Sequence, residues 1–270
     1  MCNSVYFRNN LHIEGNLAGQ RTLIFAHGFG TDQKSWEEVK NAFAQNYKLV
    51  LYDQVGAGGS DLAAYSPAKY ASLNGYAQDL LEICHSLKLK APIFIGHSAS
   101  CITGLLAATI EPEAFSRLIL LAPSPRYLND LGYVGGFEQK DLDELYQQME
   151  QNYYSWASGF SKLAMGNHQT PELADRFAET ICNLRPDIAL HVIKSIFQSD
   201  IRDVLPKINH ETLIIQSSND IAVAPEVGLY MEAHLKNGKL VNINAEGHLP
   251  HISAANEVIH TIESFLELEK

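Results

Sequence analysis

The sequence predicts an α/β fold with a mostly parallel central sheet, helices on both faces of the sheet and a helical segment inserted into it. Three observations support this prediction. Short apolar runs typical of buried strands alternate with segments of helical spacing along most of the 270 residues. The alternation stops between about residues 124 and 206, where helical patterns follow one another. Candidate catalytic side chains directly follow the apolar runs, as expected at the carboxyl ends of parallel strands.

Six runs rich in Val, Ile, Leu and aromatic residues predict the strands, at 22–26, 48–52, 92–95, 118–121, 212–216 and 240–243. Helical patterns lie between them. One of these patterns has a single apolar stripe that can pack on a sheet, formed by Tyr76, Leu80, Ile83, Cys84 and Leu87. Alternation of this kind favours parallel strands joined by right-handed crossovers.

The inserted segment, about 124–206, is interpreted as a helical lid. Two of its helices are expected to begin at Thr170-Pro171 and at Arg185-Pro186, because proline is tolerated in the first helical turn. No repeat or long Gly/Ser linker separates the segment from the rest of the chain. We therefore expect one domain over residues 1–270, with a core of about 1–123 and 207–270.

Composition and charge exclude several classes of function. Hydrophobic residues make up 46% of the chain and charged residues 19%, which favours a large buried core. The net charge of −11 opposes binding to nucleic acid or anionic lipid. No apolar run approaches the roughly 20 residues needed to cross a bilayer, and the N-terminus lacks a secretion signal. A soluble, cytoplasmic protein is expected.

The four cysteines fit a reducing compartment, because they are widely spaced and form no CxxC pair. They are Cys2, Cys84, Cys101 and Cys182. The last three lie in helical patterns and are interpreted as small packing residues.

Ser98 lies in Gly96-His97-Ser98-Ala99-Ser100, between a predicted strand and a predicted helix. This is the position of a nucleophile elbow, which holds a serine in a strained conformation and exposes its hydroxyl to a base and a substrate. Ser100 replaces the second glycine of the usual G-x-S-x-G pattern, so the motif by itself is weak.

Asp220 and His248 supply the other groups that a serine nucleophile needs. Asp220 follows the strand at 212–216, and His248 follows the strand at 240–243. A histidine takes the serine proton, and a carboxylate holds that histidine in the correct tautomer. Separately, Asp220 could be a turn residue and His248 a hydrogen-bonded loop histidine. The order Ser, Asp, His is that of α/β-hydrolases, so we interpret the three as a catalytic triad.

The loop that follows the first predicted strand is the expected oxyanion site. It begins His27-Gly28-Phe29-Gly30, and the backbone N–H groups of Phe29 and Ala99 are the expected donors. The glycines also fit a simple tight turn. His27 is interpreted as a support of this loop rather than as a base.

No cofactor or metal is expected. His248 and His251 have an i, i+3 spacing that suggests metal ligation, but no further ligand cluster accompanies them. Gly56, Gly58 and Gly59 lack the lysine and hydroxyl of a phosphate-binding loop.

Aromatic residues of the inserted segment are candidates for the roof of an apolar pocket. Tyr153, Tyr154 and Trp156 cannot all face one cavity, because they lie close together on one helix. The expected lining is His27, Tyr127, Phe137, Phe160, Phe177, Phe197, Ile221 and Ala222. An apolar pocket favours a compact, uncharged ester or lactone as substrate.

Several segments together resemble one α/β-hydrolase subfamily, which contains the bacterial stress-signalling hydrolase RsbQ and the plant karrikin and strigolactone receptors. They are 27–33 with Trp36, 52–53, 56–58, 96–100, 124–127, 135–139, 185–190 and 197–200. In that subfamily a serine at the position of Ser100 is normal. The resemblance covers all but the first dozen or so residues.

The resemblance implies a four-helix lid over the core, the triad Ser98, Asp220 and His248, and an aromatic pocket between lid and core. It also implies two uses of the pocket. One is hydrolysis of a small apolar ester or lactone, butenolide-like, in an RsbQ-type stress pathway with a phosphatase or other regulator as partner. The alternative is a small-molecule sensor whose lid recruits a protein, with slow or single-turnover hydrolysis.

Overall fold

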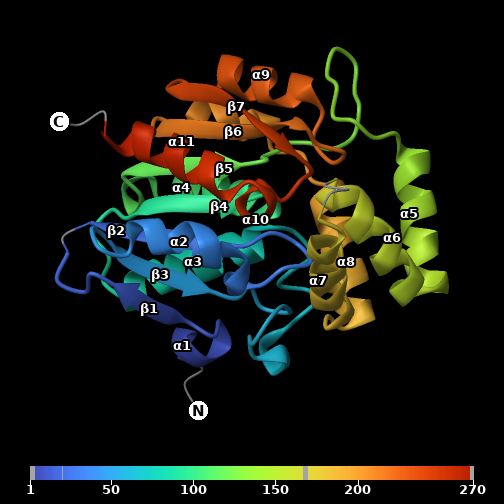
Figure 1. The fold of residues 1–270 in the computed structure, drawn as a ribbon, viewed down its shortest axis with the longest axis horizontal. Helices are drawn as coiled ribbons and strands as arrows, with labels where there is room; N and C mark the ends of the chain where they lie inside the picture. The colour runs from blue at the N-terminus through green and yellow to red at the C-terminus, as the bar shows by residue number, and fades with distance from the viewer. Residues whose placement is uncertain (1–3, 20, 167–169, 268–270) are drawn as a thin grey trace.

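A seven-stranded sheet forms the centre of the molecule in a computed structural model that describes residues 4–19, 21–166 and 170–267 (Figure 1). The strands are β1 His12–Gly15, β2 Thr22–Ala26, β3 Lys48–Tyr52, β4 Ile93–His97, β5 Arg117–Leu121, β6 Glu211–Asn219 and β7 Gly238–Glu246. Their order in the sheet is β1-β3-β2-β4-β5-β6-β7. Only the β1–β3 pair is antiparallel. The mostly parallel sheet is therefore confirmed.

The sequence predictions for the strands differ from the structure mainly at the ends. The strands predicted at 22–26 and 48–52 agree with β2 and β3, whereas β6 and β7 extend beyond their apolar centres. The edge strand β1 and the short helix α1, Val5–Arg8, were not predicted. The β1 strand is half-exposed and polar, so it lacks the apolar run that marks a buried strand.

Helices cover both faces of the sheet (Figure 1). The α-helices other than α1 are α2 Glu37–Phe43, α3 Asn74–Ser86, α4 Ala99–Ile110, α5 Gln139–Gln151, α6 Tyr153–Met165, α7 Pro171–Cys182, α8 Pro186–Phe197, α9 Pro225–His234, α10 Pro250–Ser253 and α11 Ala255–Glu267. Short 3-10 turns are η1 Gln33–Trp36, η2 Leu62–Ala64, η3 Pro112–Ala114 and η4 Arg202–Lys207.

The two faces hold separate apolar cores because side chains alternate along each strand. Leu23 and Phe25 of β2 pack with the buried residues of α2 and α11 on one face. Ile24 and Ala26 face the other way, toward α3, α4 and α9. Burial on both faces explains why the central strands are apolar along their whole length.

The inserted helices α5–α8 occur between β5 and β6, in the part of the chain where the alternation of strands and helices stops. Both proline-based predictions are confirmed, because α7 begins at Pro171 and α8 at Pro186. Figure 1 shows α6, α7 and α8 beside the carboxyl ends of the parallel strands. The inserted helices therefore lie close to the loops that carry the candidate site residues.

Candidate active site

Ser98 occupies a strained turn between β4 and α4. Its backbone angles are φ 54° and ψ −120°, in a region that non-glycine residues rarely adopt. Two backbone hydrogen bonds hold the turn: Ser98 N–H donates to the Leu121 carbonyl (2.8 Å), and Cys101 N–H donates to the Ser98 carbonyl (2.8 Å). The strain is thus balanced by neighbouring structure, and the geometry is that of a nucleophile elbow.

Ser98, His248 and Asp220 form a continuous chain of hydrogen bonds. His248 Nε2 lies 2.7 Å from Ser98 Oγ. On the other side of the ring, His248 Nδ1 lies 2.9 and 3.1 Å from the two Asp220 carboxylate oxygens. The carboxylate can only accept, so Nδ1 carries the proton and Nε2 is left to accept from the serine hydroxyl. In this tautomer His248 can accept the proton of the Ser98 hydroxyl.

Residues after Asp220 hold its carboxylate in place. The side chain of Asp220 is fully buried. Ala222 N–H and Val223 N–H donate to its Oδ1 at 2.8 and 3.3 Å. Ala222, predicted to line the pocket, thus supports the carboxylate through its backbone, while Ile221 is 51% exposed. Their predicted role as pocket residues stays a prediction.

The loop after β2, which carries Phe29, is pressed between the core and the inserted helices. A methyl group at Gly28 would lie 2.4 Å from His97 Nδ1. Gly30 has φ +79°, and a methyl group there would lie 2.9 Å from Ile181 of α7. A side chain at either position would therefore collide with a neighbour, so the loop needs glycine for close packing as well as for its turn.

Ala99 is the first residue of α4, where backbone N–H groups have no acceptor within the helix. Its amide and the Phe29 amide stay the predicted oxyanion donors.

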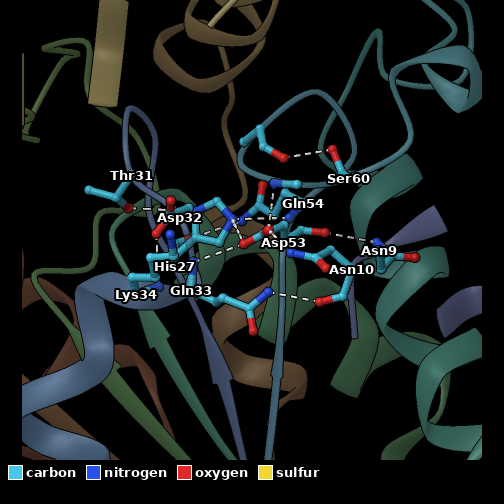
Figure 2. Close-up of polar contacts among 12 residues, drawn as sticks. Asn9, Asn10, His27, Thr31, Asp32, Gln33, Lys34, Asp53, Gln54 and Ser60 are labelled. Atoms are coloured by element: carbon cyan, nitrogen blue, oxygen red, sulfur yellow. Dashed lines mark hydrogen bonds and ion pairs between the residues drawn. The ribbon is translucent and has the colours of Figure 1, made fainter. Parts of the chain in front are cut away.

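His27 supports this loop through both of its ring nitrogens (Figure 2). Its Nε2 accepts a hydrogen bond from the Gln54 N–H (3.0 Å), and its Nδ1 lies 2.9 Å from the Gly28 carbonyl. Thr31 Oγ1 also donates to that carbonyl (2.9 Å). A cavity of about 30 Å³ lies between this loop and α8, with His27 and Phe29 among its lining residues.

The predicted aromatic residues gather in two groups. In the first, the Phe197 ring contacts Tyr127 and Phe137, with ring centroids 4.9 and 5.2 Å away. In the second, Phe160 stacks on Trp156 (5.1 Å) and lies 6.3 Å from Phe177. Of the three close aromatics on α6, Tyr154 is 62% exposed while Tyr153 and Trp156 are buried, so they do point in different directions.

The Tyr127 side chain is buried near Ser98. Burial raises the pKa of Tyr127, and the neighbouring Ser98 side chain opposes that effect. Among the residues that the structure describes, the Tyr127 hydroxyl has no partner at hydrogen-bond geometry.

Two further histidines lie beside His248 and were not assigned a role from the sequence. His97 Nε2–H donates to the His248 carbonyl (2.7 Å). The His251 ring packs between Trp36 and His97 in tilted arrangements, with centroids 4.6 and 4.4 Å away. Burial lowers the pKa of His251 to about 3 and that of His97 well below its usual value, so both rings are neutral at neutral pH. The signal in the sequence was the position of these two histidines, one directly before Ser98 and the other three residues after His248.

The thiols of Cys101 and Cys84 are protonated at neutral pH. Burial raises the pKa of Cys101, and it raises the pKa of Cys84 to about 12, so neither is a thiolate at neutral pH. Cys182 is partly exposed, and Cys2 lies outside the described residues. Within residues 4–19, 21–166 and 170–267, no group of three or more His, Cys, Asp or Glu side chains is arranged to hold a metal.

The inserted helices contact His248 directly through the backbone. His248 N–H donates to the Ala164 carbonyl of α6 (2.7 Å). Gly247 has φ +85°, and a methyl group there would lie 2.0 Å from the Met165 carbonyl. Sequence reasoning did not find this contact, because the two segments are about 80 residues apart.

None of the helices in the described part of the chain is both long enough and apolar enough to span a membrane.

Comparison with known proteins identifies the family. A family model described as the alpha/beta hydrolase fold matches residues 21–255. The chain is 41% identical over 252 residues to the Karrikin insensitive 2 receptor CA of Petunia hybrida, covering 93% of each chain. It is also 41% identical over 256 residues to the strigolactone esterase RMS3 of Pisum sativum, covering 94% of this chain and 95% of that protein.

A solved structure shows the same fold across the whole molecule. It is that of olei00960, a hydrolase from Oleispira antarctica, with a TM-score of 0.94 and 37% identity over 98% of this chain and 96% of that one. With the Ser98 elbow and the family match over most of its length, the chain belongs to the α/β-hydrolase fold family and, within it, to the karrikin- and strigolactone-receptor-like hydrolases.

Proposed function

We propose that the protein is a serine hydrolase that cleaves a small, mostly apolar ester or lactone. The observation that carries the proposal is the Ser98–His248–Asp220 chain of hydrogen bonds, with its strained serine and its defined histidine tautomer. Relatives at about 41% identity that are named esterase or receptor support the same reaction class.

In the proposed mechanism, Ser98 Oγ attacks the carbonyl carbon while His248 Nε2 takes the serine proton. The backbone N–H groups of Phe29 and Ala99 stabilise the oxyanion, and Asp220 stabilises the imidazolium that forms. His248 then returns the proton to the leaving alkoxide, and an acyl group remains on Ser98. Water, activated by the same histidine, attacks the acyl-enzyme and releases the acid.

The substrate class rests on the prediction that aromatic side chains such as Tyr127, Phe197 and Phe160 line the substrate pocket. Their rings favour a compact ligand with one polar carbonyl and little charge. The names of the relatives refer to strigolactones and karrikins. Together with the predicted aromatic lining of the pocket, these names favour a butenolide-like lactone as the ligand.

A sensor function is the second candidate, and the hydrogen bond from His248 N–H to the Ala164 carbonyl of α6 favours it. Acylation of Ser98 changes the surroundings of His248, and this contact provides a route from the site to the inserted helices. A change in α5–α8 then recruits a protein partner, with slow hydrolysis restoring the free state.

The test is a time course with a chromogenic short-chain ester, followed by intact-mass spectrometry of the wild type and Ser98→Ala. Steady turnover that falls by about 10³-fold or more in Ser98→Ala supports the hydrolase. A stoichiometric adduct on the wild type without turnover supports the sensor. Ser86→Ala, an exposed serine at the end of α3, is the control and should behave as wild type. Full activity in Ser98→Ala overturns the assignment of the nucleophile.

A further inference from the structure

The carbonyl of His27 accepts two side-chain hydrogen bonds in the core. Gln54 Nε2 donates to it at 2.8 Å, and Ser100 Oγ donates to it at 2.5 Å. Gln54 Nε2 also donates to Ser100 Oγ at 2.5 Å, which closes a triangle of hydrogen bonds. All three residues are at least nine-tenths buried. A buried amide and a buried hydroxyl that both satisfy one carbonyl fix its position strongly.

This triangle joins the two segments that carry the expected oxyanion donors. Ser100 directly follows Ala99 at the start of α4, and His27 stands two residues before Phe29. The bond between Ser100 and His27 therefore connects the two segments just beyond Ala26 and Gly96, the last paired residues of β2 and β4. A glycine at position 100 could not supply this hydroxyl.

Gln54 contacts His27 through both its backbone and its side chain (Figure 2). Its backbone N–H donates to the His27 ring, so it contacts the same residue at ring and carbonyl. Its neighbour Asp53 is buried and accepts hydrogen bonds from Gln33 N–H (2.9 Å), Gly59 N–H (2.8 Å) and Asn10 Nδ2 (2.8 Å). Hydrogen bonds of Asp53 and Gln54 thus connect the loop after β2 to the segment that follows β3.

We propose that Ser100 and Gln54 are positioning residues of the oxyanion site, acting through the His27 carbonyl on the placement of the Phe29 N–H. The proposal rests on the proposed hydrolase function. Oxyanion donors act on charge that develops in the transition state, so their displacement lowers kcat more than it raises KM. A shift on the order of 1 Å in such a group can cost about 10²-fold in rate.

The experiment compares Ser100→Ala, Ser100→Gly, Gln54→Leu and the Ser100→Ala/Gln54→Leu double variant with the wild type. Two quantities are measured: kcat and KM with a chromogenic short-chain ester, and the Kd of phenylboronic acid, which forms a tetrahedral adduct on a reactive serine. Thr109→Ala is the control, because its hydroxyl lies on the same helix and donates to the Leu105 carbonyl of that helix. Thermal unfolding shows which variants are folded, and Ser100→Gly provides the motif's usual glycine if the alanine variant does not fold.

The expected result is a fall in kcat of about 10- to 100-fold in each single variant, with KM changed less than about twofold. The Kd of the boronic acid should rise by the same factor as kcat/KM falls, while the pH midpoint of kcat/KM stays unchanged. The double variant should lose less than the product of the two single losses, because both side chains hold one carbonyl. Thr109→Ala should match the wild type.

Two results overturn the proposal. If the wild type hydrolyses the ester and the folded variants match it in kcat and in boronic acid Kd, the positioning role is wrong and the hydrolase function stands. If the wild type neither hydrolyses the ester nor binds the boronic acid, the proposed function fails and this proposal fails with it.

Discussion

At the scale of single residues, the candidate site depends on which hydrogen-bond partner each polar atom has. The Asp220 carboxylate accepts from His248 Nδ1 and from two backbone N–H groups, so all of its contacts are with donors. His248 is therefore held in one tautomer, and Ser98 lies on the side of the ring that accepts a proton.

Asp220→Asn tests this arrangement. The amide that replaces the carboxylate can turn an N–H toward the imidazole, which favours the opposite histidine tautomer. We expect kcat for a short-chain ester to fall by about 10³- to 10⁴-fold, with a small change in thermal stability. Asp203→Asn, an exposed carboxylate paired with Lys207, serves as control and should keep wild-type activity. A kcat within about tenfold of wild type in Asp220→Asn would contradict the proposed role.

At the scale of the elements, the contact between α6 and the loop after β7 links the inserted helices to His248, the proposed base. The α6 helix ends at Met165, and the carbonyls of its last turn face Gly247 and His248. This close approach needs glycine at 247 for two reasons: its φ is positive, and a side chain would collide with the Met165 carbonyl.

Gly247→Ala should separate α6 from the base. The added methyl group would lie 2.0 Å from the Met165 carbonyl, so one of the two segments must move. We expect a loss of about 1–3 kcal/mol in the free energy of unfolding and a clear fall in kcat, measured by urea unfolding and ester kinetics.

The matched control is Gly159→Ala on α6, where a methyl group would meet no atom within 4 Å. That change should stabilise the helix by about 0.5–1 kcal/mol and leave activity unchanged. Equal effects of the two substitutions would show that the contact with the Met165 carbonyl is unimportant.

At the scale of the whole molecule, packing on both faces of the sheet buries two neutral histidines, His97 and His251, next to the candidate site. Burial, together with nearby His248 and His27, lowers the pKa of His251 to about 3. In the unfolded chain the same group takes up a proton near its ordinary pKa of about 6.5. Between these two values the unfolded state binds more protons, so stability falls as the pH falls. The lowered pKa of His97 acts in the same direction.

His251→Gln should reduce this sensitivity to acid. For one such histidine, each pH unit below about 6.5 costs about 1.4 kcal/mol of unfolding free energy, until the pH approaches 3. We therefore measure the free energy of unfolding in urea at about pH 7.5 and about pH 5.5. Its decrease between the two pH values should be about 1 kcal/mol smaller in His251→Gln than in the wild type. His260→Gln, an exposed histidine on α11, should retain the wild-type loss. An unchanged acid dependence in His251→Gln would refute this explanation.

The sequence by itself determined the order of the buried strands and the helices between them, and which kinds of side chain follow those strands. Parallel strands buried on both faces have long apolar runs, so β2 and β3 could be predicted to the residue, and two helix starts followed from Pro171 and Pro186. Ser98, Asp220 and His248 could be predicted to lie together because a parallel sheet brings the residues that follow its strands to the same side of the molecule. Local patterns could not predict β1, which is short, polar and at the edge of the sheet.

Tertiary structure alone decided which groups touch across long separations in the chain. The bond from Ser100 to the His27 carbonyl spans 73 residues, and the bond from His97 to the His248 carbonyl spans 151. Neither has a local signature, because a buried hydroxyl or imidazole can be satisfied by any carbonyl that the packing brings near. The same holds for the Ala164 carbonyl and the His248 amide. Periodicity and spacing report which face of an element is buried, whereas the partner of a buried polar atom is fixed only when the elements pack together.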